Sequence, residues 1–195
     1  MTRHLNNSKL PNWFEPVKFN FESVLLPLKG KELSFLQLGA YSGDASIWMV
    51  ENVLTNPKSF LVDVDIWQLT DQVAYEGINW VEVENSYDLK RAQCNKILKY
   101  KGRTTDFLRE TNETFDFIYI DADHESSSVL SDAVHSWPLL KPGGIMAFDD
   151  YLWDQGRGPL HNPRLAIESF LSIYSRELAV IIDNWQIWIQ KRPEV

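Results

Sequence analysis

Acidic residues and a histidine follow two short apolar runs in the second half of the chain. The runs cover residues 115–120 and 145–148, and the polar residues that follow them are Asp121, Asp123, His124, Asp149 and Asp150. Carboxylate oxygens are the ligands that a hard divalent cation such as Mg²⁺ prefers, and an imidazole accepts a proton near neutral pH. These residue types could therefore hold a cation and a proton acceptor together.

The two apolar runs are short and continuous, as is typical of buried parallel strands. A helix-length segment at 126–137 and a Pro-Gly-Gly turn separate them. A helix between two such strands forms a right-handed βαβ unit, which brings the carboxyl ends of both strands to the same edge of the sheet. Open α/β sheets bind ligands along that edge. The acidic residues and the histidine are therefore predicted to face one crevice.

Other interpretations of the acidic residues stay open at this stage. Asp121 can orient a ligand through water, Asp149 and Asp150 can bond to loop amides, and His124 can cap the following helix. Asp123 fits a structural role better, because its side chain should turn away from its neighbours at an extended strand end.

A second motif follows the apolar run at 33–38. It begins at Gly39, which permits a tight turn, and Gly43 lets the backbone approach a ligand at the start of the next helix. About twenty residues later, the strand at 60–64 ends in Asp65, whose carboxylate can accept two hydrogen bonds from a ribose diol. Tyr41 takes the place of the middle glycine of dinucleotide-binding loops. The motif therefore indicates a ribose-bearing cofactor without a pyrophosphate.

The remaining pattern completes an α/β alternation. Further strands are expected at 97–100, 178–182 and 185–190, and helices at 42–54, 85–95 and 164–175, with one helical turn at 106–110. Asp183-Asn184 is too short a connection for anything but an antiparallel hairpin. The sequence predicts a Rossmann-like, doubly wound sheet of about seven strands, mostly parallel with an antiparallel C-terminal strand, in the order 3-2-1-4-5-7-6.

The overall composition limits the possible partners. The chain has 195 residues, a hydrophobic fraction of 44% and a net charge of −8, which suits one globular domain and disfavours broad binding to nucleic acid or anionic lipid. Cys94 is the only cysteine, so no internal disulfide can form. The N-terminus is polar and no apolar run approaches the ~20 residues that span a bilayer. We expect a cytoplasmic protein with no membrane partner.

Residues 1–30 are expected to form a separate arm or short helix, ahead of a domain at 31–195. Three prolines alternate with aromatic residues in this arm, among them Trp13, Phe14 and Phe21. Such a segment packs on its own domain or on a partner, which leaves a homodimer as one interpretation.

The motifs FLQLGAYSGDAS, LVDVD, FDFIYIDADH, LLKPGGIMAFDDYLW and VIIDNWQIWIQ together resemble class I S-adenosylmethionine-dependent methyltransferases. The resemblance covers roughly residues 30–192. It is greatest to a small subgroup with a DxDH…FDDY pattern, similar to methyltransferase family 24. Some relatives with that pattern are divalent-metal-dependent O-methyltransferases of sugars or natural products.

The resemblance implies a role for each matching position. The residues around the methionine part of the cofactor would be Gly39, Ala40, Tyr41, Gly43 and Ser46. Asp65 would hold the ribose, and Thr104 would stand beside the adenine, where Arg103 replaces an Asp found in many members. Asp121 would face cofactor and metal, Asp149 and Asp150 would complete the metal site, and His124 would be the general base.

The sequence thus predicts an S-adenosylmethionine-dependent methyltransferase that acts on a hydroxyl of a sugar, glycan or small metabolite with the help of Mg²⁺. Trp153, Arg157 and His161, in the loop after Asp150, could cover the acceptor. A metal-dependent hydrolase and a non-catalytic cofactor-binding module remain alternatives. A nicotinamide-dependent oxidoreductase is disfavoured, since it would require GxGxxG and a parallel last strand.

Overall fold

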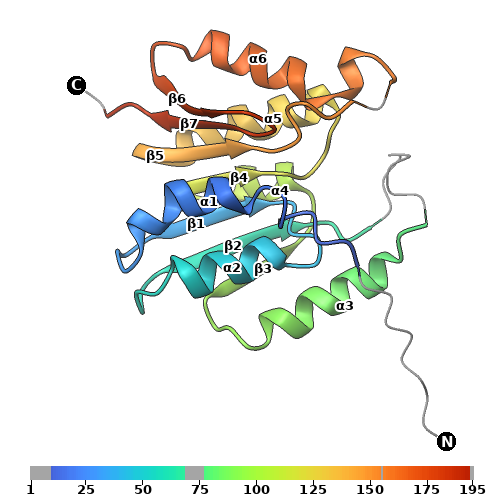
Figure 1. Ribbon diagram of the computed structural model, residues 1–195, viewed down its shortest axis with the longest axis vertical. Helices are drawn as coiled ribbons and strands as arrows, with labels where there is room; N and C mark the ends of the chain where they lie inside the picture. Colours follow the sequence, from blue (N-terminus) through green and yellow to red (C-terminus); the bar gives the residue numbers. More distant parts are fainter. Residues whose placement is uncertain (1–9, 69–76, 155, 194–195) are drawn as a thin grey trace, which may run out of the picture.

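A single seven-stranded sheet organises the protein (Figure 1). The computed structural model describes residues 10–68, 77–154 and 156–193. The strands are β1 (Ser34–Leu38), β2 (Phe60–Asp65), β3 (Ile97–Lys101), β4 (Phe115–Ile120), β5 (Leu140–Phe148), β6 (Leu178–Asp183) and β7 (Ile187–Lys191). Their order is β3-β2-β1-β4-β5-β7-β6, with β7 antiparallel to both β5 and β6 and the other pairs parallel. The predicted order and the reversed C-terminal strand are confirmed.

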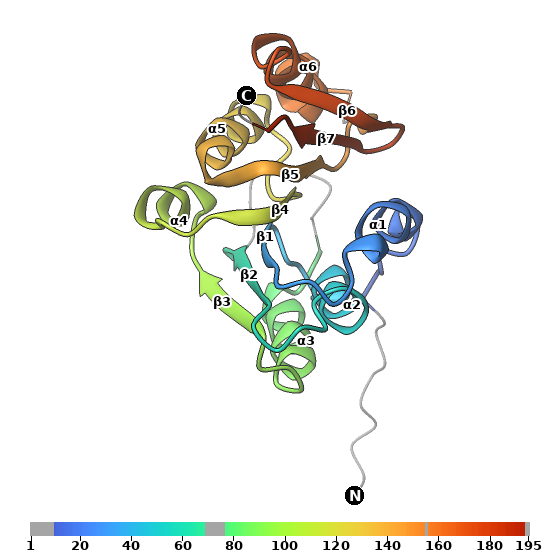
Figure 2. The same cartoon turned by 90° about the vertical axis from the view of Figure 1, so that its left-hand side faces the viewer.

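Helices cover both faces of the sheet (Figure 2). On one face lie α1 (Lys18–Leu25), α2 (Asp44–Asn52) and α3 (Trp80–Arg91), and on the other lie α4 (Thr104–Glu110), α5 (Ser126–Ser136) and α6 (Pro163–Ile173). Short 3-10 turns η1 (Leu26–Leu28), η3 (Trp137–Leu139) and η4 (Pro159–His161) complete the elements. Each face has its own apolar core, because strands that are buried on both sides project alternate side chains into two layers.

The expected turn at Pro142-Gly143-Gly144 is instead part of β5. This strand begins at Leu140, which is buried and pairs with Phe115 of β4. A register shift between Phe115 and Phe117 accommodates the glycines within the pairing. Burial of Leu140 therefore extends the strand across residues whose local preference is for a turn.

The helix predicted at 85–95 begins earlier and ends earlier. Asn79 caps α3, since its side-chain oxygen accepts a hydrogen bond from the backbone nitrogen of Glu82 at 3.3 Å. Val83 and Tyr87, four residues apart, are the buried residues of the helix. The segment expected as one turn at 106–110 is the longer helix α4.

The N-terminal segment packs on its own domain where the structure describes it. Phe21 and Leu25 of α1 are fully buried, and the Phe21 ring lies edge-on to Trp188 of β7 at 4.8 Å. Residues 1–9 of the predicted arm lie outside the described residues. The aromatic residues at Phe14 and Phe21 are accounted for by this packing and do not require a second copy of the chain.

Within the described ranges, none of the helices has both the length and the apolar character needed to cross a bilayer.

Candidate active site

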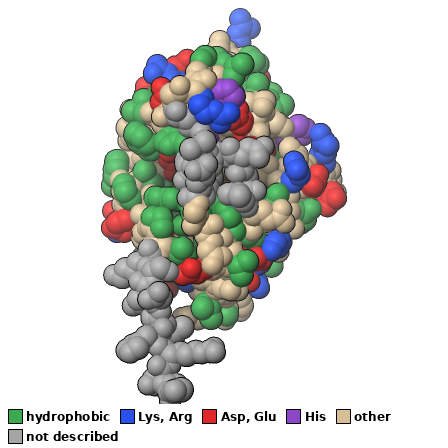
Figure 3. All heavy atoms as spheres, turned by 90° about the vertical axis from the view of Figure 1, so that its right-hand side faces the viewer, with side chains coloured by type: hydrophobic (Ala, Val, Ile, Leu, Met, Phe, Trp, Pro, Cys, Tyr) green, Lys and Arg blue, Asp and Glu red, His purple; other side chains and the backbone are tan. Residues whose placement is uncertain are grey.

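A cavity of about 820 Å³ lies at the carboxyl ends of β1, β2 and β4. Its wall includes five of the residues that the sequence predicted to contact the cofactor: Gly39, Tyr41, Asp65, Thr104 and Asp121. Figure 3 shows the side of the molecule on which these strands end, where acidic and basic side chains are interspersed. The position of the cavity agrees with the edge of the sheet at which open α/β folds bind ligands.

Gly39 lets the end of β1 approach the end of β4. Its φ is +90°, and a Cβ atom built on it would lie 1.9 Å from the backbone oxygen of Asp121. The backbone nitrogen of Asp121 donates to the backbone oxygen of Leu38 at 2.8 Å. The glycine is therefore required for the contact between the two strand ends as well as for the turn itself.

Three residues of the predicted cofactor loop, Ala40, Gly43 and Ser46, do not line the cavity. Gly43 precedes α2 with φ +83°, and a Cβ on it would lie 2.9 Å from the Tyr87 ring. Ser46 is fully buried and its hydroxyl donates to Gln37 Oε1 at 3.1 Å. Because the first turn of α2 packs against the core instead of facing the cavity, we assign these residues a supporting role in the loop.

Asp65 holds the glycine loop in place. Its Oδ2 atom accepts hydrogen bonds from the backbone nitrogens of Ala40 and Tyr41, each at 2.9 Å, and its Oδ1 atom accepts one from Trp67 at 2.7 Å. Burial raises the pKa of this carboxyl above its ordinary value, and the three amides oppose that rise. Asp65 therefore connects the end of β2 to the loop after β1 while it still lines the cavity.

Aromatic side chains from three segments form one wall of the cavity. Tyr41, with φ 46°, stacks on Trp13 at 4.4 Å between ring centroids and lies edge-on to Trp80 at 6.2 Å. Burial, followed by the charge of Asp44, raises the pKa of Tyr41 to about 12. No sequence pattern assigned Trp13 or Trp80 to the site, since no periodicity connects three segments so far apart in the chain.

A buried acid stands behind Thr104 on the opposite wall. The Thr104 hydroxyl donates to Oδ1 of Asp132 on α5 at 2.7 Å, and both residues line the cavity. Burial raises the pKa of Asp132 to about 7. No sequence pattern marked Asp132, because it lies inside a helix and only the packing of α4 against α5 brings it to the cavity.

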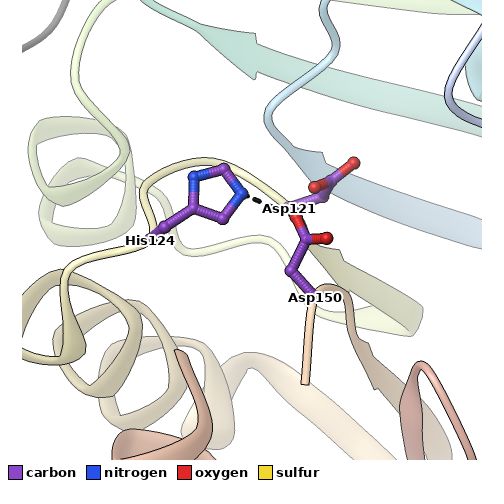
Figure 4. Close-up of side chains that lie close together, drawn as sticks. All are labelled: Asp121, His124 and Asp150. Atoms are coloured by element: carbon purple, nitrogen blue, oxygen red, sulfur yellow. Dashed lines mark hydrogen bonds and ion pairs between the residues drawn. The ribbon is translucent and has the colours of Figure 1, made fainter. Parts of the chain in front are cut away.

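Asp121, His124 and Asp150 lie together at the ends of β4 and β5 (Figure 4). One ligand atom from each lies within 4.8 Å of the others, which is a spacing that could hold a metal ion. The Nε2 atom of His124 is 2.6 Å from Oδ2 of Asp150. The imidazole is only 5% exposed and packs against the Trp153 ring at 4.4 Å between centroids. The predicted convergence of these three residues is thus present.

Asp149 does not join this cluster. Its Oδ2 atom accepts hydrogen bonds from the Tyr119 hydroxyl and from Nε2 of Gln186, the latter at 3.0 Å, and its Oδ1 atom accepts one from the backbone nitrogen of Asp150 at 2.7 Å. Gln186 in turn accepts from Asn20 of α1 at 2.8 Å. The side chain of Asp149 therefore supports the turn at Asp150, whose φ is 56°, instead of completing the metal site as predicted.

The acids at this strand edge repel one another. The pKa of Asp121 lies well above its ordinary value, first because of burial and then because of the charges of Asp149 and Asp150. Burial and the charge of Asp150 likewise raise the pKa of Asp149 to about 6. A cation at the cluster would relieve this repulsion, since it favours the ionised form of every nearby carboxyl group.

The loop after β5 folds over the start of α5. His161 and Arg157 both reach Glu125, with His161 Nδ1 at 2.8 Å and an Arg157 guanidinium nitrogen at 3.6 Å. All three residues line the cavity. These contacts connect the loop predicted to cover an acceptor with α5, the helix that follows β4.

The reversed seventh strand, the glycine turn after β1 and the carboxylate at the end of β2 together define a class I S-adenosylmethionine-dependent methyltransferase. A family model described as a methyltransferase domain, methyltransferase family 24, matches residues 36–151. This match covers more than half of the chain, and the chain belongs to that family. No curated protein sequence matches it significantly.

Solved structures share the fold at low sequence identity. The O-methyltransferase TomG from Streptomyces achromogenes, in complex with S-adenosylmethionine, is 14% identical, with a TM-score of 0.67 over 92% of this chain and 80% of its own. The Bacillus cereus O-methyltransferase in complex with S-adenosylhomocysteine is 17% identical, with a TM-score of 0.64 over 91% and 81%.

The mycinamycin-pathway methyltransferase MycE, in complex with Mg, S-adenosylhomocysteine and mycinamycin VI, is 16% identical. Its TM-score is 0.61 over 93% of this chain and 50% of MycE. This protein is thus an S-adenosylmethionine-dependent methyltransferase by family, and its fold is one that O-methyltransferases use.

Proposed function

We propose that the protein methylates a hydroxyl oxygen of a sugar or another small metabolite with the assistance of a divalent cation. The observation that carries this proposal is the convergence of Asp121, His124 and Asp150 within 4.8 Å beside the cofactor cavity. A hydroxyl is a weak nucleophile near neutral pH, so its methylation requires a proton acceptor and precise positioning.

We assign the proton acceptor to His124. Its imidazole is buried, packs against Trp153 and stands 2.6 Å from Asp150, which together restrict its orientation. The proton leaves the acceptor hydroxyl as the oxygen attacks the methyl carbon in line with the departing sulfur. A carboxylate beside the imidazole stabilises the imidazolium that results.

Asp121 and Asp150 fit a divalent cation, because the two carboxylates meet at one site, where burial and the neighbouring charge of Asp150 disfavour the ionised form of Asp121. Such a cation, when bound, lowers the pKa of a coordinated hydroxyl and fixes its position. Asp149 fits a positioning role, since it bonds to the backbone nitrogen of Asp150. The MycE structure, which holds Mg together with S-adenosylhomocysteine and mycinamycin VI, supports the same assignment by similarity of fold.

The cofactor contacts proposed here are Gly39, Tyr41, Asp65, Thr104 and Asp121, all of which line the cavity. The acceptor would enter beside Trp153, Arg157 and His161, where aromatic and cationic side chains suit a polar, sugar-like molecule. Interspersed surface charges and a net charge of −8 favour a small molecule over nucleic acid and accord with a cytoplasmic enzyme.

A transfer assay tests the proposal. Purified protein would be incubated with radiolabelled S-adenosylmethionine and a panel of hydroxylated sugars and polyols, with Mg²⁺ or with EDTA. The panel also includes amino sugars and primary amines. We expect transfer to hydroxyls that requires Mg²⁺ and falls at least a hundredfold in His124→Ala. Transfer that EDTA leaves unchanged would refute metal assistance, and labelling of amines alone would refute O-methylation.

A further inference from the structure

We propose that Asp132 recognises the 6-amino group of the cofactor's adenine and so sets the specificity of the base pocket. The inference rests on the cofactor site described above. It gives a function to a buried acid on α5 that the methyl-transfer chemistry does not use.

Strand order determines where the base must lie. The order β3-β2-β1-β4-β5 puts Asp65, the proposed ribose ligand, at the end of β2 and the reacting cluster at the ends of β4 and β5. The sulfur must face the reacting cluster, so the base extends from the ribose in the opposite direction, toward the end of β3. The cavity wall there consists of Gly102, Arg103 and Thr104 on one side and α5 on the other.

One face of α5 lines this part of the cavity. Ser128, Ser131 and Asp132 follow the three- and four-residue spacing that places side chains on the same helix face. Asp132 is the acidic residue of this face, and it is 2% exposed. A purine that enters between α4 and α5 therefore meets a carboxyl group that bulk water hardly reaches.

One oxygen of Asp132 is available to a ligand. Oδ1 accepts the hydrogen bond from Thr104, whereas no described residue donates to Oδ2. Because Asp132 lines the cavity, a ligand there that brings an N–H group can donate to Oδ2 and gains affinity at this point. Adenine presents its 6-amino group as a donor.

The test compares two ligands whose purines differ at position 6 and at the neighbouring N1. S-inosylhomocysteine carries a carbonyl oxygen at position 6 in place of the amino group of S-adenosylhomocysteine, and a hydrogen on N1. A carboxylate that faces position 6 therefore meets an acceptor in place of a donor. A site built to accept a hydrogen bond discriminates strongly against such a replacement. Calorimetric titration of the wild-type protein should give a dissociation constant at least about tenfold lower for the adenosyl ligand, the ratio that 1.4 kcal/mol represents.

Variants separate recognition from structural support. The amide of Asp132→Asn can donate to the carbonyl, so the preference should fall to within about threefold. Thr104→Val removes the hydrogen bond to Oδ1 but keeps the acid. It should lower the affinity for both ligands by the same factor and leave the preference for the adenosyl ligand unchanged. Ser128→Ala is the matched control, because it changes the same helix face of the cavity wall without touching the acid. It should keep the wild-type preference for the adenosyl ligand.

Two results would overturn the inference while the cofactor site stands: equal affinity of the wild-type protein for both ligands, or an unchanged preference in Asp132→Asn. The wild-type comparison decides the question even if the variant does not fold. If the wild-type protein failed to bind S-adenosylhomocysteine at all, the cofactor site itself would be refuted, and this inference with it.

Discussion

The backbone oxygen of Asp121 occupies the place that a side chain at Gly39 would need. A Cβ atom on Gly39 would lie 1.9 Å from that oxygen, closer than any side chain tolerates. The turn that begins the proposed cofactor loop and the end of β4, which carries the proposed catalytic carboxylate Asp121, are therefore in direct contact. A side chain at Gly39 would therefore displace both the turn and the strand end.

We expect Gly39→Ala to destabilise the fold by on the order of 3 kcal/mol or more and to abolish cofactor binding, because positive φ and a backbone clash act together. Thermal unfolding and titration with S-adenosylhomocysteine would measure both effects. Gly30→Ala is the matched control, since Gly30 has φ +84° with nothing within 4 Å of its added Cβ. Equally small losses of stability and of cofactor affinity in the two variants would contradict the role of the Asp121 contact.

Asp65→Ala should weaken binding of S-adenosylhomocysteine by about 1–3 kcal/mol, as expected for the loss of hydrogen bonds to a charged acceptor. The structure adds a second expectation, that the melting temperature falls, because three backbone amides lose their acceptor. Calorimetry and thermal unfolding of the same samples would test the two effects. Unchanged affinity would exclude Asp65 as a cofactor ligand.

Asp150→Asn should remove stimulation by Mg²⁺ while the affinity for S-adenosylhomocysteine stays within about threefold of wild type, because the change removes a proposed ligand outside the ribose site. Asp149→Asn is the matched comparison. It keeps one acceptor oxygen for Tyr119 and Gln186 and should retain metal stimulation at lower thermal stability. Metal stimulation that survives in Asp150→Asn but disappears in Asp149→Asn would reverse the assignment of the ligand.

Trp13→Ala should weaken cofactor binding several-fold, since the ring stacks on Tyr41 and lines the cavity, and such aromatic pairs contribute about 0.5–1.5 kcal/mol. Phe19→Ala provides the control from the same segment, because Phe19 is 57% exposed. Equal affinity of the two variants for S-adenosylhomocysteine would exclude a role for the aromatic wall.

Asp63 should make the protein less stable as the pH rises from about 4 to 7. Burial raises the pKa of this fully buried carboxyl from 3.8 to about 7, so the native state holds a proton that the unfolded chain has released. Its contribution to the free energy of unfolding is complete below pH 3.8 and is lost as the pH approaches 7. The expected loss is on the order of 4 kcal/mol, since each unit between the two pKa values corresponds to about 1.36 kcal/mol.

Urea unfolding of wild type and Asp63→Asn between pH 4 and 8 would measure this contribution. The variant should show a smaller decline in the free energy of unfolding over that range. Tyr87→Phe, which removes the hydroxyl that donates to Asp63 at 2.9 Å, should keep the decline. Parallel curves for wild type and Asp63→Asn would show that Asp63 is already ionised in the native protein.

The sheet could be predicted because each strand is marked by a short run of consecutive residues. Continuous apolar runs such as 115–120 must be buried wherever the chain places them, and the short connection at Asp183-Asn184 leaves only a hairpin. Errors arose where packing opposed local preference. Leu140 extends β5 through a Pro-Gly-Gly segment, and Asn79 caps α3 ahead of the helix start predicted at residue 85.

The sequence by itself determined the class of fold, the cofactor and the edge of the sheet where the chemistry occurs, since each depends on the order of elements and on the residues that end them. Tertiary structure alone decided which side chains face the cavity. Adjacent acids such as Asp149 and Asp150 diverge because each takes the hydrogen bonds within its own reach. Asp132 reaches the cavity only because α5 packs beside α4, a contact between distant parts of the chain that no local pattern encodes.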